Sequence, residues 1–303
     1  MLNTDSRPKV SRFPRPIAST LILAFTFSLA VSETSAQVPA CKPPAYNFVT
    51  LKAPFPGVDQ TLAYGINDLG SIVGVYNDTT GPHGFVLDGA TYTPINVPFP
   101  EAQNTVAFGI NIFRQIVGTY TAGGITHGYL LNNGTFTPID YPASGVIATF
   151  PRAINALGQV AGFYDDAAGS HGFFMSQGKF TAINVPFAGV SWTQALGTND
   201  RSEIIGSYGT SDGKIHGFGR TAGGFIQGFD LPPAGSVQTV AYALNNREQI
   251  AGAGFLYDSG VLFTLTELNP SAVSASTIGV NDLGQMVGVY GGSPENGFLM
   301  TPK

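Results

Sequence analysis

The sequence predicts an all-β fold: a six-bladed β-propeller built from four-stranded repeats of about 44 residues and closed into a ring by its N-terminal strand. Three observations predict it. One asparagine recurs at a nearly fixed period, short apolar runs separated by turn residues surround each copy, and the two ends of the repeat region complement each other. Gly and Pro interrupt the chain too often for helical periodicity, which also favours strands.

The asparagine of the string Gly-Ile-Asn-Asp is the register mark of the repeat. Successive marks are 44, 44, 44, 46 and 36 residues apart, and a glycine stands seven positions after each one. All four histidines occupy one slot, and each is followed by Gly and then by Phe or Tyr. Such regularity indicates tandem copies of one structural unit. The marks are Asn67, Asn111, Asn155, Asn199, Asn245 and Asn281, and the histidines are His83, His127, His171 and His216.

The first full unit contains four apolar runs. The predicted strands are Thr61–Ile66, Ser71–Tyr76, a third that begins at Gly84 after a polar loop, and Thr91–Val97. Large and small side chains alternate along the first run, which makes one face of the sheet bulky and the other small. We expect such sheets to pack bulky face onto small face around a ring. The stretch 236–251 has helical spacing, but it is predicted as a hairpin because it aligns with the other copies.

The ends of the repeat region predict how the ring closes. Residues 46–56 resemble the fourth run of the other copies, whereas the last copy, which ends with residues 296–303, has no fourth run. We therefore expect the N-terminal strand to complete the sixth blade.

The segment that precedes the repeats predicts export. Residues 1–36 place four basic side chains before a fifteen-residue apolar run and small residues, the pattern of a secretory signal peptide. Residues 37–45 are then a linker, and residues 46–303 form the propeller domain. The apolar run is short for a membrane span, so we expect a secreted protein, extracellular or periplasmic. Cys41, the only cysteine, lies in a loose likeness of a lipoprotein processing box, which leaves a lipid-anchored form open.

The composition of the chain indicates which classes of binding partner to expect. The net charge is −5, and removal of residues 1–36 makes it more negative, which disfavours nucleic acid because Lys and Arg supply that affinity. Charged residues make up only 11% of the chain, against about 25% in an ordinary domain, which suits sheets buried on both faces. We expect a monomer without a membrane span.

Two patterns resemble a metal site and a catalytic serine motif, but a purely structural role explains each of them better. Four histidines at one slot suggest a metal site, but equivalent atoms on neighbouring blades lie too far apart to share one ion. We expect each histidine to hydrogen-bond the backbone at the start of its strand. Residues 209–213 match G-x-S-x-G, but they fall in a loop position rather than at a strand-to-helix turn. The sequence therefore predicts no catalytic residue, no metal and no cofactor.

The better candidates for a site are positions where the copies differ. Seven places before the marks, at one mouth of the predicted channel, stand amide side chains and the only tryptophan, and one arginine interrupts an otherwise apolar slot. Amides, an aromatic plane and one Arg suit a glycan or a small polar ligand, although the tryptophan could instead pack between blades and the arginine bind local carbonyls. The candidate ligand-binding residues are Trp192, Arg152, Gln60, Asn104 and Gln238.

The units resemble the HAF-repeat family of predicted extracellular bacterial repeat proteins. The likeness rests on Gly65-Ile-Asn-Asp-Leu-Gly-Ser-Ile-Val-Gly74 followed by His83-Gly-Phe85, and it covers residues 46–303. The chain departs from the motif by having Gly in place of Ala, and by lacking the histidine in its last two copies. The resemblance implies export and a repeat fold and supplies no catalytic residues. We expect a secreted binding or scaffolding module rather than an enzyme. The alternatives are a propeller lyase or hydrolase with its site at the channel, and a lipid-anchored structural protein of the cell surface.

Overall fold

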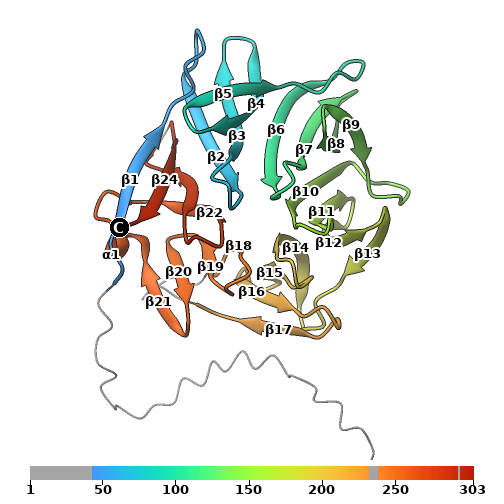
Figure 1. Ribbon diagram of the computed structural model, residues 1–303. Helices are drawn as coiled ribbons and strands as arrows, with labels where there is room; N and C mark the ends of the chain where they lie inside the picture. Colours follow the sequence, from blue (N-terminus) through green and yellow to red (C-terminus); the bar gives the residue numbers. More distant parts are fainter. Residues whose placement is uncertain (1–42, 232–237, 293) are drawn as a thin grey trace, which may run out of the picture. The chain divides into compact units, whose positions relative to one another are not determined.

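The computed structural model describes residues 43–231, 238–292 and 294–303 (Figure 1). Every described residue belongs to one compact unit, Ser35–Lys303. The predicted signal peptide and Cys41 lie outside the described residues, as does most of the predicted linker. No helix in the described ranges is long and apolar enough to cross a membrane.

The described residues are almost entirely β structure, as predicted. They form 24 strands and one four-residue helix, α1 (Leu265–Leu268). Three sheets each contain four consecutive strands, paired antiparallel in chain order. They consist of β2 (Gln60–Ile66), β3 (Ile72–Asp78), β4 (Gly81–Asp88) and β5 (Thr91–Ile95); of β14 (Val190–Thr198), β15 (Ile204–Thr210), β16 (Ile215–Arg220) and β17 (Ile226–Phe229); and of β18 (Ala241–Leu244), β19 (Ile250–Gly252), β20 (Phe255–Asp258) and β21 (Val261–Thr264). The pairing of β18 with β19 confirms the predicted hairpin within 236–251.

A fourth sheet has eight strands. It consists of two antiparallel four-stranded groups that are joined by a single parallel pairing, between Ala148 and Thr126. Hydrogen bonding therefore groups the described strands into five sheets rather than six separate ones. The eight strands are β6 (Gln103–Ile110), β7 (Ile116–Ala122), β8 (Ile125–Asn132), β9 (Thr135–Ile139), β10 (Ala148–Ile154), β11 (Val160–Asp166), β12 (Gly169–Ser176) and β13 (Lys179–Ile183).

The fifth sheet joins the two ends of the repeat region. The strand β1 (Tyr46–Leu51) pairs antiparallel with β24 (Asn296–Pro302), and β23 (Met286–Tyr290) and β22 (Ser276–Val280) follow in the same sheet. Figure 1 shows β1, at the blue end of the colour scale, beside the red β24. This pairing confirms the predicted completion of the last unit by the N-terminal strand.

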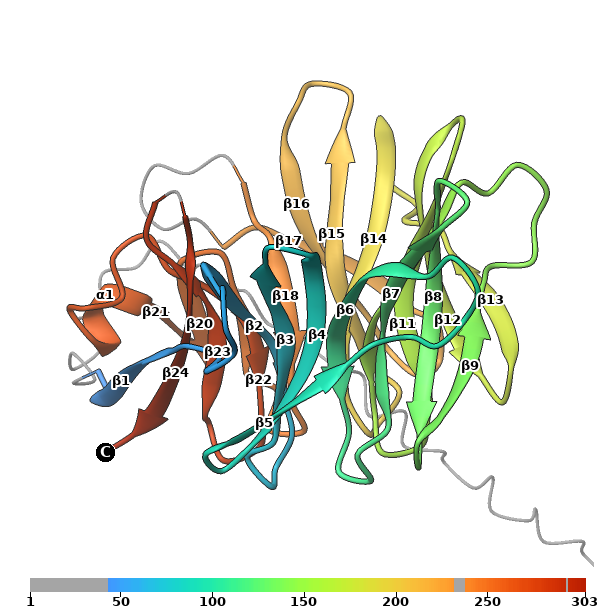
Figure 2. The ribbon, with the colours of Figure 1, turned by 90° about the horizontal axis from the view of Figure 1, so that it is seen from above.

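The sheets stand around a common centre, with the first strand of each unit innermost (Figures 1 and 2). Each of these strands contacts the corresponding strand of the next unit, from β2 through β6, β10, β14, β18 and β22, and β22 in turn contacts β2. This closed ring of antiparallel sheets is a β-propeller, the predicted fold class.

The second and third strands of the first unit are longer than predicted. We predicted a polar loop between Tyr76 and Gly84, but β3 continues to Asp78 and β4 begins at Gly81. The reason is that polar side chains here pair across the hairpin, where Tyr76 lies opposite His83 and their rings stack at 5.2 Å. Cross-strand contacts of this kind stabilise a ladder that composition alone presents as a loop.

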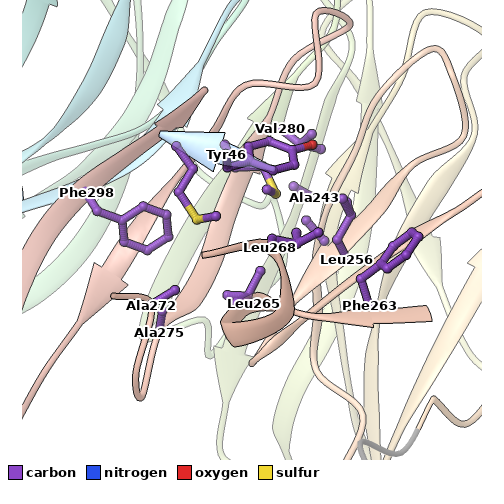
Figure 3. Close-up of a cluster of buried hydrophobic side chains, with 13 residues drawn as sticks. Tyr46, Ala243, Leu256, Phe263, Leu265, Leu268, Ala272, Ala275, Val280 and Phe298 are labelled. Atoms are coloured by element: carbon purple, nitrogen blue, oxygen red, sulfur yellow. The ribbon is translucent and has the colours of Figure 1, made fainter. Parts of the chain in front are cut away.

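A hydrophobic cluster closes the seam between the last two units and the N-terminal strand. Tyr46 of β1, Phe263 of β21, Leu268 of α1 and Phe298 of β24 lie within it, all at most 6% exposed. Figure 3 shows these side chains converging from segments far apart in the chain. The ring is therefore closed by apolar packing as well as by strand pairing.

Candidate functional site

Each innermost strand carries a β-bulge three residues before its asparagine mark. In β2, Ala63 pairs with Gly74 and Gly65 pairs with Val73, so Tyr64 has no partner residue across the ladder. A bulge of this kind inserts one residue and re-aims its side chain. The six residues that the ladder skips are Tyr64, Phe108, Arg152, Leu196, Tyr242 and Ile278.

These six residues, which we call the collar, face the central channel. They line a cavity of about 90 Å³ together with the two residues that follow each of them. The predicted packing of this bulky position against the small face of the next sheet is therefore wrong, because the bulge turns it toward the axis. The small position beside it behaves as predicted: a Cβ on Gly65 would lie 2.5 Å from the carbonyl oxygen of Phe108 on the next strand.

Arg152 is the only charged residue of the collar. The carbon at the centre of its guanidinium lies 3.9 Å from the centre of the Phe108 ring, a cation–π contact. Among the described residues the guanidinium makes no hydrogen bond and no ion pair. Arg152 remains partly accessible from the channel, although protein surrounds most of its side chain. This burial lowers the pKa of Arg152.

Two tyrosines supply the other polar groups of the collar. Neither the Tyr64 nor the Tyr242 hydroxyl has a hydrogen-bond partner among the described residues, and neither hydroxyl is sealed from solvent. Burial raises the pKa of both tyrosines, the charge of Arg152 opposes that rise, and the Glu295 carboxylate adds to it. Both are therefore neutral phenols at pH 7, and each has an O–H free to donate.

The six marker asparagines form a closed ring of hydrogen bonds at one end of the inner strands. Each side-chain amide donates to the backbone carbonyl of the next marker, at distances from 2.8 to 3.5 Å. In the first copy the Asn67 Oδ1 also accepts from the backbone N–H groups of Leu69 and Ser71. One asparagine thus holds its own turn and the neighbouring unit, which is the physical reason for the register mark.

The channel mouth beside this ring is acidic. A cavity of about 100 Å³ there is lined by the asparagine ring and by the residues that follow it, including Asp68, Asp200 and Asp282. Their carboxylates accept backbone hydrogen bonds from the neighbouring unit, as Asp68 does from the N–H of Asp282 at 2.7 Å. Burial raises the pKa of Asp68, and the charges of Asp282 and Asp200 add to the rise.

The five predicted ligand-binding residues do not meet in one place. Arg152 lies in the collar, whereas the other four stand at the opposite end of the inner strands from the asparagine ring and line neither cavity. Gln60 hydrogen-bonds Asn77 and the carbonyl of Glu295, and Asn104 donates to Thr121. The remaining two are Trp192, described next, and Gln238, which is exposed and forms an isolated bridge with Ile215.

The indole of Trp192 lies over Gly209 on the neighbouring strand of its own sheet. A Cβ on Gly209 would collide with the indole nitrogen, so the contact requires glycine. The side chain remains partly exposed. Its predicted role as a stacking platform for a ligand stays a prediction.

Sequence reasoning missed the two collar tyrosines. It recognised Arg152 as an interruption of an apolar slot but treated the rest of that slot, including Tyr64 and Tyr242, as packing. Arg152 could have revealed them, because a charged residue at one of six equivalent positions indicates that all six face a cavity or solvent rather than a hydrophobic core.

The histidines bind side chains rather than the backbone, so that part of the prediction is wrong. Each imidazole stacks on the tyrosine that lies opposite it on the neighbouring strand, with ring centres 5.1 to 5.2 Å apart. Within the described residues no group of three His, Cys, Asp or Glu side chains could hold a metal ion. The side-chain hydrogen-bond partners are Asn96 and Thr80 for His83, Asp140 for His127, Asp166 for His171, and Asp230 and Thr210 for His216.

The G-x-S-x-G string lies between two strands, as predicted. It starts at the end of β15, and β16 begins at Ile215, so no helix follows Ser211. The backbone N–H of Ser211 donates to the carbonyl of Gly189. The geometry of a nucleophile elbow is missing at this serine.

Comparisons with known proteins bear on the fold. No family model and no curated protein matches the chain. Among solved structures, a gluconolactonase from Xanthomonas campestris is 12% identical and covers 87% of this chain and 96% of its own, with a TM-score of 0.52. A catalytically inactive virginiamycin B lyase from Staphylococcus aureus is 12% identical over 85% of this chain and 100% of its own, with a TM-score of 0.49. A lectin from Aleuria aurantia, in complex with α-methyl-L-fucoside, is 13% identical over 86% and 78%, with a TM-score of 0.41. The first likeness agrees with the propeller fold, and a fold at such identity does not define an activity.

Proposed function

We propose that this chain is an exported propeller that binds a small polar ligand in its central channel, with Arg152 as the anchor. One observation carries the proposal. A guanidinium surrounded by protein, without a hydrogen bond or counter-ion among the described residues, faces a cavity of about 90 Å³. Burying a charge without a partner costs free energy, so a group that completes its hydrogen bonds gains affinity there.

The composition of the collar favours binding over catalysis. The residues that line its cavity include no carboxylate and no histidine, and general acid–base chemistry usually needs one of them. The tyrosines are held neutral by burial, which suits donation of a hydrogen bond rather than removal of a proton. A glycan at the opposite mouth, where Trp192 and the amides stand, is a finer proposal that rests on those side chains.

We also propose that the ring has six blades. Six bulged inner strands and six linked asparagines support this count, and the eight-stranded sheet then consists of two blades joined at one residue pair. A crystal structure at high resolution tests it. A break in the six-fold series of bulges would contradict it.

The proposal of export rests on residues 1–36 and is tested by mass spectrometry of the protein recovered outside the cytoplasm. We expect a free N-terminus near Gln37. A diacylglyceryl mass on Cys41 would instead support the lipid-anchored alternative.

The binding proposal is tested by thermal-shift screening of the exported protein against small polar solutes, followed by calorimetry of the hits. We expect a hit that is lost in Arg152→Met. The matched control is Arg220→Gln, which removes the same charge from β16, outside both cavities. Retention of every hit by Arg152→Met would overturn the channel site.

A further inference from the structure

We infer that the collar binds a carboxylate, and that its ligand is a small aliphatic monocarboxylate held by Arg152, Tyr64 and Tyr242. This inference rests on the proposed channel site and names the chemical class of its ligand. The argument follows from the charge, the hydrogen-bonding capacity and the size of the collar.

The first step concerns charge. Two other arginines of the described residues pair with acids: Arg114 makes two hydrogen bonds of 2.7 Å to the carboxylate of Asp88, and Arg201 lies 2.9 Å from the carboxylate of Glu203. Arg152 has no such partner among the described residues, and its neighbours in the collar are neutral. Arg220, which has no ion pair among the described residues either, lines neither cavity. One fixed positive charge among the neutral side chains of the collar favours a ligand with a single negative charge and disfavours cations.

The second step concerns geometry. The central carbon of the Arg152 guanidinium lies over the ring of Phe108, which offers its N–H groups no oxygen or nitrogen acceptor. Two parallel N–H groups match the two oxygens of a carboxylate. Tyr64 and Tyr242 line the same cavity, and their hydroxyls have no partner among the described residues, so we expect them to donate to the bound carboxylate.

The third step concerns size and the apolar wall. A cavity of about 90 Å³ is smaller than the cavity of about 150 Å³ that accommodates benzene in another protein, so the part of the ligand inside it has fewer than about six non-hydrogen atoms. Phe108, Leu196 and Ile278 alternate around the collar with the three polar residues and offer contacts for a short hydrocarbon chain. Propionate, with five non-hydrogen atoms, combines one negative charge with such a chain.

Glu295 supplies an independent check. Burial is the main cause of the raised pKa of both collar tyrosines, and the Glu295 carboxylate adds to it, so its negative charge acts on the same side chains. An anion in the collar is repelled by this charge, whereas a neutral ligand is not. Removing the charge therefore distinguishes the two kinds of ligand.

The experiment is isothermal titration calorimetry of the exported protein with sodium propionate, with 1-propanol and propylamine as the neutral and cationic probes of similar size. We expect propionate to bind and the other two to give no heat of binding. We expect Arg152→Met to weaken propionate at least about tenfold, the loss of a hydrogen-bonded charge pair. Glu295→Gln should tighten it severalfold at low salt and less at high salt, and Arg220→Gln is the control.

The paired variant Tyr64→Phe with Tyr242→Phe keeps the shape of the collar and removes only its hydroxyls, so it tests the site even if Arg152→Met fails to fold. We expect severalfold weaker propionate binding. Binding of propanol or a neutral sugar in an Arg152-dependent way, with propionate no better, would overturn the carboxylate and leave the channel site standing. Propionate binding that neither the Arg152 variant nor the tyrosine variant alters would overturn both.

Discussion

The side-chain amide of Asn281 donates to the backbone carbonyl of Asn67 at 2.9 Å, across 214 positions of the chain. It is the hydrogen bond that completes the ring of six, because every other link joins a marker to the next one along the chain. Both asparagines are buried, at 3% and 4% exposure.

We expect Asn281→Asp to lower the free energy of unfolding by about 1–3 kcal/mol, because the carboxylate keeps an acceptor for the turn but cannot donate to Asn67. Chemical denaturation measures the change. Asn155→Asp, in the middle of the series, is the companion variant and should cost a similar amount. If Asn281→Asp alone were neutral, the seam bond would not contribute to ring closure.

The N-terminal strand should be essential for stability. Tyr46, 3% exposed, packs in the seam cluster with Phe298, and we expect Tyr46→Ala to cost about 3–5 kcal/mol, as for other large buried side chains. Thermal melts of the exported protein measure this. Asn47→Ala, one residue on and exposed, should be nearly neutral. Equal melting of both variants would contradict the seam.

The glycine seven positions after each mark should tolerate no side chain. A Cβ on Gly74 would collide with the carbonyl oxygen of Leu62 and lie 2.9 Å from the ring of Phe85. We expect Gly74→Ala to cost more than about 3 kcal/mol, since backbone must move. The control is Gly292→Ala, where a Cβ meets nothing within 4 Å. A stable Gly74→Ala protein would refute the close packing of β2 on β3.

The acidic mouth should make stability depend on pH. Burial raises the pKa of Asp68, so the folded state holds that proton more tightly than the unfolded chain does. Its contribution to stability is complete below the ordinary Asp pKa of about 3.9 and is lost as the pH rises through the raised folded value. We therefore expect Asp68→Asn to be more stable than the wild type at pH 7 and equally stable near pH 3.

Urea denaturation at pH 3, 5 and 7 measures this difference. Asp78→Asn should behave in the opposite way, because the hydroxyl of Thr80 lowers the pKa of Asp78 and its ionised form is favoured in the fold. A difference between Asp68→Asn and the wild type that stays constant with pH would count against the desolvated carboxylate.

Arg152 should reduce stability in the absence of a ligand. We expect Arg152→Met to raise the free energy of unfolding by about 1–2 kcal/mol, because it replaces an unpaired charge surrounded by protein with an apolar side chain of similar length on Phe108. The wild type should recover the difference on saturation with propionate, by mass action. Loss of stability in Arg152→Met would show that the guanidinium has a structural role.

Much of the fold can be predicted from the sequence because each repeat needs particular residue types at its turn and in its hairpin. Asn67 and Gly74 stand at constant spacing since the turn needs an amide and the hairpin needs a residue without a side chain. The complementary ends predict the pairing of β1 with β24 for the same reason: a unit without its fourth strand exposes an unpaired edge. The side chains that bind the histidines could not be predicted, because Asn96, Asp140 and Asp230 directly follow the fourth strand of their unit and Asp166 ends the second strand of its own.

By itself, the sequence determined the all-β class, the repeat unit and the closure by the N-terminal strand, and it singled out Arg152. The tertiary structure alone decided where that arginine points. Strand alternation places Tyr64 and Arg152 on the bulky face of a sheet, but a bulge depends on how two strands pair, and no single run of residues encodes that. The bulge turns one residue of each inner strand toward the axis, and ring closure then brings six of them together from positions as far apart as Tyr64 and Ile278. The candidate site therefore depends on the register of strand pairing and on closure of the ring. Both involve residues far apart in the chain, so a local stretch of sequence does not predict them.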